Sequence, residues 1–176
     1  MKRRFFIFVQ LLIFAFGVSA QEKEAREIDA FGVLPCGDFE SRMSLLRAIS
    51  QNSPDSKIYV VYYGSRFRKE NVWNKKTKNY DKIQLKYPHR EDGLNWAKSI
   101  SIYLTTENSY PTETRNFFKD KIVFLNGGFQ ENLQVEIWLV PKDAAPPKPF
   151  PTIDEKEIKF RKGKPIKTPD YTTCYD

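Results

Sequence analysis

The chain has 176 residues and a formal net charge of +7, with 29 Lys and Arg side chains against 22 Asp and Glu. Removal of Lys2, Arg3 and Arg4, which belong to a predicted leader, lowers the net charge to about +4. So small an excess does not by itself indicate a nucleic-acid partner. The remaining ~155 residues correspond to one ordinary domain.

The first twenty residues, 1–20, have the pattern of a signal peptide. The three basic residues precede an apolar run from Phe5 to Val18, and Val18-Ser19-Ala20 resembles a cleavage site before Gln21. The alternative is an uncleaved membrane anchor, but the run is shorter than the ~20 residues that a membrane-spanning helix needs. We therefore expect an exported protein, periplasmic or secreted, with no stable membrane span after cleavage.

Two cysteines, Cys36 and Cys174, lie outside the predicted leader. In an oxidising compartment an even pair is most simply a disulfide, which would tie the end of the chain to the start of the domain. The alternative is two unrelated thiols.

The first half of residues 21–141 predicts a short strand, a helix and a central strand. Phe31 and Val33 lie in an extended stretch, and Asp38 is a candidate N-cap for a helix over 39–51. The next stretch, KIYVVYYG (57–64), is apolar on both faces and predicts a covered strand. The expected buried face of the helix consists of Phe39, Met43, Leu46 and Ile49.

A basic segment, residues 65–91, follows this strand and is too long for a simple connection. We expect a hairpin with its turn at KKTKN (75–79) and with Trp73 and Tyr87 among its aromatic residues. These rings either pack on the domain or form a surface that stacks on sugars.

The second half predicts a helix from Asp92, a short helical turn over 112–120 and two strands. The first strand is KIVFL (121–125), and NGG (126–128) is expected to form a turn after it. Alternating apolar residues over 133–140 predict the last strand, with Trp138 on its outer side. Residues 142–176 are rich in proline, then basic, and are predicted to form an extended C-terminal tail.

These elements give an α+β fold, a two-layer α/β sandwich in the order β-α-β-α-β-β with a long basic insertion after the second strand. REIDAFGVLPCGDFESRMSLLRAISQNSPDSKIYVVYYGS resembles the first half of an OmpA-like peptidoglycan-associating domain. LNWAKSISIYL, KIVFLNGG and NLQVEIWLV resemble its second helix and closing strands. The resemblance covers residues 26–141, and the chain is also similar to a group of uncharacterised exported bacterial proteins.

The resemblance implies a test of ligand binding. Such domains hold the diaminopimelate of peptidoglycan with an Asp from a Gly-His-Thr-Asp motif and an Arg from a Leu-Ser-x-x-Arg-Ala helix. Here Gly64 is followed by Ser65, Arg66 and Phe67, and Trp96 stands where the Arg is expected. The closing Asn-Arg-Arg-Val-Glu pattern is reduced to Asn-Leu-Gln-Val-Glu from Asn132. The scaffold is similar, whereas the ligand-binding pair is missing.

The end of the central strand instead carries basic residues, which could accept an anionic group or form the start of a solvated loop. The candidate ligand-binding residues are Arg66, Arg68, Trp73, Trp96 and Asn132. The single histidine, His89, has no catalytic partner in the sequence, so we expect no catalytic residue, no metal and no cofactor.

Three hypotheses follow. The first is a non-enzymatic envelope domain that binds a protein or an anionic cell-wall polymer. The second is peptidoglycan binding through a rearranged site, which an acid such as Glu70 or Glu131 facing Arg66 would support. The third is an enzyme of unrecognised type, which would need a pocket that groups His89 with carboxylates.

Overall fold

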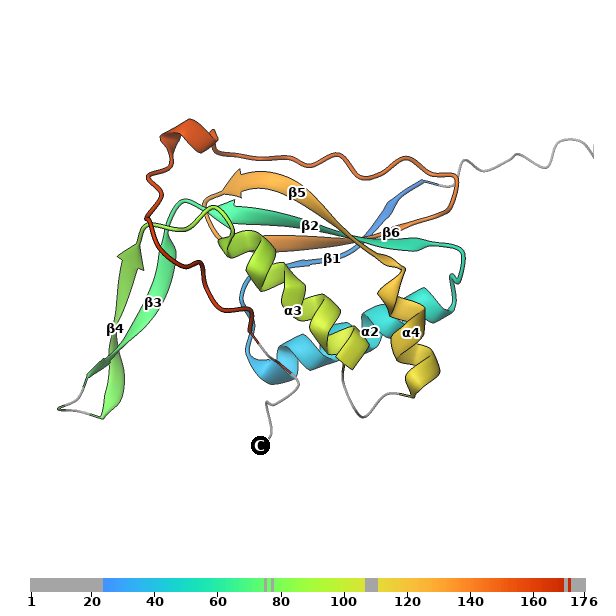
Figure 1. Ribbon diagram of the computed structural model, residues 1–176, viewed down its shortest axis with the longest axis horizontal. Helices are drawn as coiled ribbons and strands as arrows, with labels where there is room; N and C mark the ends of the chain where they lie inside the picture. The colour runs from blue at the N-terminus through green and yellow to red at the C-terminus, as the bar shows by residue number, and fades with distance from the viewer. Residues whose placement is uncertain (1–23, 75, 77, 107–110, 170, 172–176) are drawn as a thin grey trace, which may run out of the picture.

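The computed structural model describes residues 24–74, 76, 78–106, 111–169 and 171 of the chain. These residues form a mixed α+β domain with a four-stranded mixed sheet, a two-stranded hairpin and three helices (Figure 1). The predicted signal peptide and Cys174 lie outside the described residues.

The four-stranded sheet has the order β1-β6-β2-β5, in which β2 and β5 are parallel and the other neighbours are antiparallel. The α-helices cover one face of this sheet, and the hairpin of β3 and β4 projects beyond its end (Figure 1). The strands are β1 (Arg26–Phe31), β2 (Lys57–Ser65), β3 (Arg68–Asn74), β4 (Asn79–Lys86), β5 (Ile122–Gln130) and β6 (Gln134–Val140). The helices are α2 (Cys36–Gln51), α3 (Asp92–Thr106), α4 (Thr112–Lys119) and the short 3-10 helix η1 (Glu155–Glu157).

The main core lies between the helices and the sheet. Apolar residues at helical spacing in α2 and α3 meet alternate residues of β2 and β6, as the periodicity predicts. Phe39, Met43 and Leu46 of the predicted helix face are buried, and Ile49 is partly buried. The large side chains that are fully buried include Trp96, Phe39, Phe118, Met43, Leu46, Ile58, Ile100, Leu104 and Ile137.

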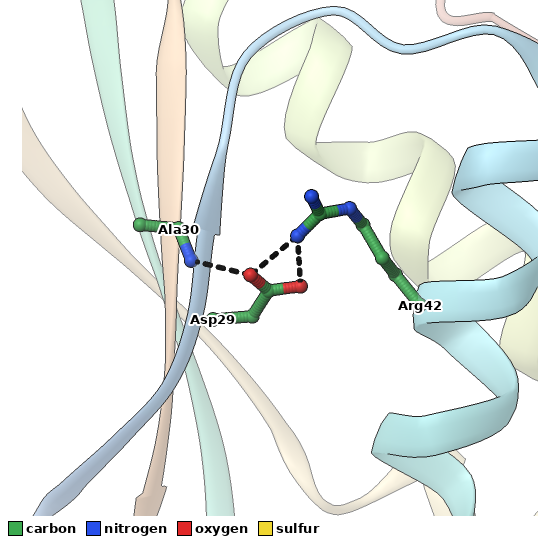
Figure 2. A network of polar contacts seen from close by, with 3 residues as sticks. All are labelled: Asp29, Ala30 and Arg42. Carbon is green, nitrogen blue, oxygen red and sulfur yellow. Dashed lines mark hydrogen bonds and ion pairs between the residues drawn. The ribbon is translucent and has the colours of Figure 1, made fainter.

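An ion pair holds α2 against the edge strand β1. The Arg42 guanidinium contacts both oxygens of Asp29, with Nη1 2.5 Å from each (Figure 2). The same guanidinium lies 5.1 Å from the centre of the Phe31 ring. Because both charged groups are part-exposed, we assign this pair mainly a positioning role.

Two predicted details are wrong. Asp38 lies inside the first turn of α2 instead of capping it, and Pro35 is the N-cap, with no side-chain cap.

The NGG stretch does not end a strand, because β5 continues through it to Gln130. Gly128 adopts φ +84°, a left-handed value that glycine accepts readily, and the register of β5 against β2 shifts nearby. NGG therefore forms an irregularity within a strand, as a bulge does.

The chain after β6 covers the sheet face opposite the helices (Figure 1). Phe150 N donates a 3.1 Å hydrogen bond to the Tyr63 hydroxyl, and Phe129 forms an isolated bridge with Ile153. Desolvation by burial is the largest cause that raises the pKa of Tyr63 to about 12. The predicted two-layer arrangement is thus supplemented by an extended segment packed on the second face.

The same segment then passes the base of the hairpin and reaches the helices. Arg161 N donates to Pro88 O at 3.0 Å, and the Arg90 guanidinium lies 4.4 Å from the centre of the Phe160 ring. Farther along, the Tyr171 ring stacks on Phe39 of α2 with 3.9 Å between centroids and 10° between planes. Residues 142–169 and Tyr171 therefore wrap around three sides of the domain.

Tyr171, three residues before Cys174, stacks on Phe39, three residues after Cys36, whereas Cys174 lies outside the described residues, so the Cys36–Cys174 disulfide stays a prediction. We expect the folded protein to show no reactive thiol until it is unfolded and reduced, and a digest to yield the two cysteine peptides linked. Reduction should lower the free energy of unfolding by about 2–5 kcal/mol, since the bond closes a very long loop. Two alkylatable thiols in the unreduced, denatured protein would contradict the prediction.

Candidate functional site

A cavity of about 560 Å³ lies at the carboxyl end of β2. Its walls come from the ends of β1 and β2, the first turns of α3, the β5–β6 connection and the C-terminal segment. A strand end of this kind is a common ligand position in open α/β sheets. The lining residues are Gly32, Val33, Ser65, Phe67, Arg68, Asp92, Trp96, Asn132, Leu133, Ile166, Lys167 and Pro169.

Close backbone packing allows α3 to begin beside this strand end. A Cβ atom built on Gly93 would lie 3.0 Å from the carbonyl atoms of Tyr63 and 3.1 Å from Gly64 N. A side chain at position 93 would therefore push α3 away from β2. The close approach brings the first turns of α3 to the mouth of the cavity.

The charged lining residues are two cations, Arg68 and Lys167, and one carboxylate, Asp92. Asp92 is 1% exposed, and each of its oxygens accepts a backbone hydrogen bond. Oδ2 accepts from His89 N at 3.0 Å, and Oδ1 accepts from Ile166 N at 2.8 Å. The two cations outnumber the one carboxylate, whose oxygens are already occupied by backbone N–H groups, so the lining has a net positive charge.

Asp92 is the first residue of α3, as the sequence predicts. Its carboxylate reaches back to the turn before the helix and across to the C-terminal segment. Asn95 Nδ2 donates to Ile166 O at 3.2 Å, so both backbone polar groups of Ile166 bond to side chains of α3. This pair of hydrogen bonds fixes the cavity wall formed by Ile166 and Lys167.

Trp96 forms the inner wall of the cavity and is 1% exposed. Its ring meets Phe31 edge-on, with 5.8 Å between centroids and 78° between planes. The Nε1–H group of Trp96 is buried and has no hydrogen-bond partner at ordinary geometry. It lies close enough to the Tyr171 hydroxyl to influence the pKa of that group. Burial raises the pKa of Tyr171, and the Trp96 side chain and the Leu34 carbonyl oppose this rise.

The structure brings three of the five predicted ligand-binding residues to this cavity, namely Arg68, Trp96 and Asn132. Arg66 does not line it. Its guanidinium lies 3.4 Å from Glu131 Oε1 and 3.1 Å from Glu157 Oε2. Trp73 belongs to β3, but its side chain lies outside the described part of the structure.

The arrangement at Arg66 meets the condition set by the second hypothesis, because Glu131 does face the guanidinium. Both groups are accessible, with side-chain exposures of 35% and 63%. The side chain of Glu70, the other acid considered, lies outside the described part of the structure.

His89 lies at a second, smaller cavity of about 220 Å³ on the other side of the α3 start. Glu91 is the carboxylate residue that lines it, and Arg90 and Arg161 supply positive charge. Among the described residues, no group of three His, Cys, Asp or Glu side chains could hold a metal ion. None of the helices in the described ranges is long and apolar enough to cross a bilayer.

Sequence reasoning missed the contribution of the C-terminal segment to the cavity. Ile166, Lys167 and Pro169 carry no periodicity that places them beside α3. Phe67 also lines the cavity, and its position next to Arg68 after the central strand is the signal in the sequence that points to it.

Replacement of Asp92 tests whether this carboxylate holds the wall of the cavity. We expect Asp92→Ala to lower the free energy of unfolding by about 2–3 kcal/mol, since one buried and one part-buried N–H group lose their acceptor. Urea denaturation measures this effect. Asp38→Ala is the matched control, because Asp38 is exposed in the first turn of α2, and we expect a loss below about 1 kcal/mol. Equal losses in the two variants would contradict the assigned role.

Comparison of the chain with models of known families, with curated proteins and with solved structures gave no match.

Proposed function

We propose that this protein is an exported, non-enzymatic domain that binds an anionic group of a cell-envelope polymer in the cavity at the end of β2. The observation that carries the proposal is the charge of this cavity. Arg68 and Lys167 line it, whereas its carboxylate, Asp92, is satisfied by backbone N–H groups. Guanidinium and ammonium groups beside a partly enclosed space suit phosphate or carboxylate.

Several further features support an envelope role. The leader over residues 1–20 predicts export, and the predicted disulfide suits an oxidising compartment. The sequence of main-sheet elements, with a hairpin inserted after the central strand, is compatible with the OmpA-like resemblance. The cavity lies where that resemblance implies a ligand, but its chemistry has changed from an acid–arginine pair to two cations.

Removal of the cavity cations should weaken binding of an anionic polymer. We expect Arg68→Ala and Lys167→Ala each to reduce affinity for immobilised polygalacturonate or linear polyphosphate by about tenfold, since each removes a charge-assisted contact. Binding is measured at low and high salt, because interactions of exposed charges are screened by salt.

Lys142→Ala is the control for this experiment, since it removes the same charge from an exposed position outside the cavity. Denaturation midpoints show whether a variant has lost its fold. An equal loss of binding in all three variants would mean that only the general basic charge attracts the polymer, which would contradict a site in the cavity.

A second candidate function is favoured by the contact between Arg66 and Glu131. A guanidinium and a carboxylate side by side match a ligand that carries both a carboxylate and an ammonium, as the peptide stems of peptidoglycan do. Glu157, 3.1 Å from Arg66, adds a second acid at this place.

Purified peptidoglycan sacculi distinguish the two candidates. If Arg66 and Glu131 bind the peptide stem, the wild-type protein should co-sediment with sacculi even at high salt. Arg66→Ala and Glu131→Gln should each abolish this salt-resistant binding. Arg68→Ala should then leave this binding unchanged. If both Arg66→Ala and Glu131→Gln still bind sacculi at high salt, peptidoglycan binding through this pair is excluded.

A further inference from the structure

Two exposed aromatic rings lie next to each other at the base of the hairpin. Phe67 is 40% exposed and Tyr87 is 43% exposed. Their centroids are 6.1 Å apart and their planes differ by 34°, so the rings form one continuous ledge. Large apolar side chains held together on a surface generally mark a binding surface.

The register of the hairpin accounts for this placement. Arg68 pairs with Lys86, so the residues before and after them, Phe67 and Tyr87, lie opposite each other where the two strands separate. Leu85 of β4, two positions before Tyr87, is 57% exposed, and the alternation of side chains in a strand places it on the same side of the hairpin. The antiparallel strands thus fix the rings before any ligand arrives, which lowers the entropic cost of binding.

The ledge is continuous with the cationic cavity. Phe67 lines the cavity as well as contacting Tyr87, and Val33, which is 66% exposed, forms part of the cavity lining too. Positive groups flank the ledge at both ends. Arg68 lies on the cavity side, and the Lys159 ammonium lies 5.0 Å from the centre of the Tyr87 ring.

We propose that the ledge of Phe67 and Tyr87 is a subsite for a sugar ring, so the ligand of the cavity is an anionic glycan. This inference rests on the proposed function and names the ligand class of the same site. The C–H face of a pyranose ring can lie on the negative face of an aromatic ring, while its carboxylate or phosphate substituent meets Arg68 or Lys159. A polymer that carries charge without rings would use the cations and leave the ledge empty.

Two anionic polymers, one with sugar rings and one without, test the inference with the purified protein. Polygalacturonate offers sugar rings and carboxylates, and linear polyphosphate offers charge alone. We expect Phe67→Ala and Tyr87→Ala to weaken binding of polygalacturonate by roughly tenfold, as loss of an aromatic stacking partner does, and to leave polyphosphate binding unchanged. Phe150→Ala is the control, since Phe150 is 76% exposed and lies by the second face of the sheet, away from the ledge.

The outcomes separate this inference from the proposed function. If both polymers bind the wild-type protein and neither ledge variant discriminates between them, the sugar subsite is overturned while an anion site in the cavity stands. If neither polymer binds, both fail. Tighter binding of single-stranded oligonucleotide than of polygalacturonate, lost in the ledge variants, would assign the ledge to bases and overturn the glycan assignment.

Discussion

The buried carboxylate of Asp92 is the interaction on which the cavity depends. It joins the start of α3 and the turn just before it, at His89, to Ile166 in the C-terminal segment, which is distant in sequence. A buried carboxylate is costly unless its lone pairs are used, and here each oxygen accepts an N–H. The sheet alone would give an open end at β2. Asp92 and Asn95 turn this end into a partly enclosed space, because they hold the C-terminal segment across it.

The C-terminal segment consequently belongs to the folded domain. It covers the second face of the sheet at Phe150 and Ile153, passes the hairpin at Arg161 and supplies Lys167 to the cavity. A ligand that contacts both Arg68 and Lys167 would link the strand end to this segment. By mass action such a ligand would stabilise the wrapped arrangement, so binding and order of the segment are coupled. The predicted disulfide would act on the same equilibrium from the far end of the segment.

The sequence patterns predicted the local elements well because each element has its own hydrophobic period. The buried faces of α2 and β6 follow from spacing, and the hairpin of residues 68–86 follows from the length of its segment and its turn residues. Predictions that depended on distant neighbours were less successful. NGG has the composition of a turn, but pairing with β2 extends the strand through it.

Of the residues at the candidate site, Arg68, Trp96 and Asn132 could be predicted, because they follow a central strand or stand at positions of a family pattern. Ile166 and Lys167 were missed because side chains of α3 place them.

The two arginines after the central strand illustrate why charge in a sequence does not by itself locate a site. Arg66 and Arg68 are separated by one residue, yet Arg66 faces Glu131 and Glu157, whereas Arg68 lines the cavity. Pairing with two carboxylates reduces the attraction of Arg66 for an anion, since a ligand must first compete with them. Arg68 and the exposed ring of Phe67 both line the cavity. In the proposed site, a cation next to an exposed ring would recognise charge and shape together, and this combination would distinguish a glycan from a simple polyanion.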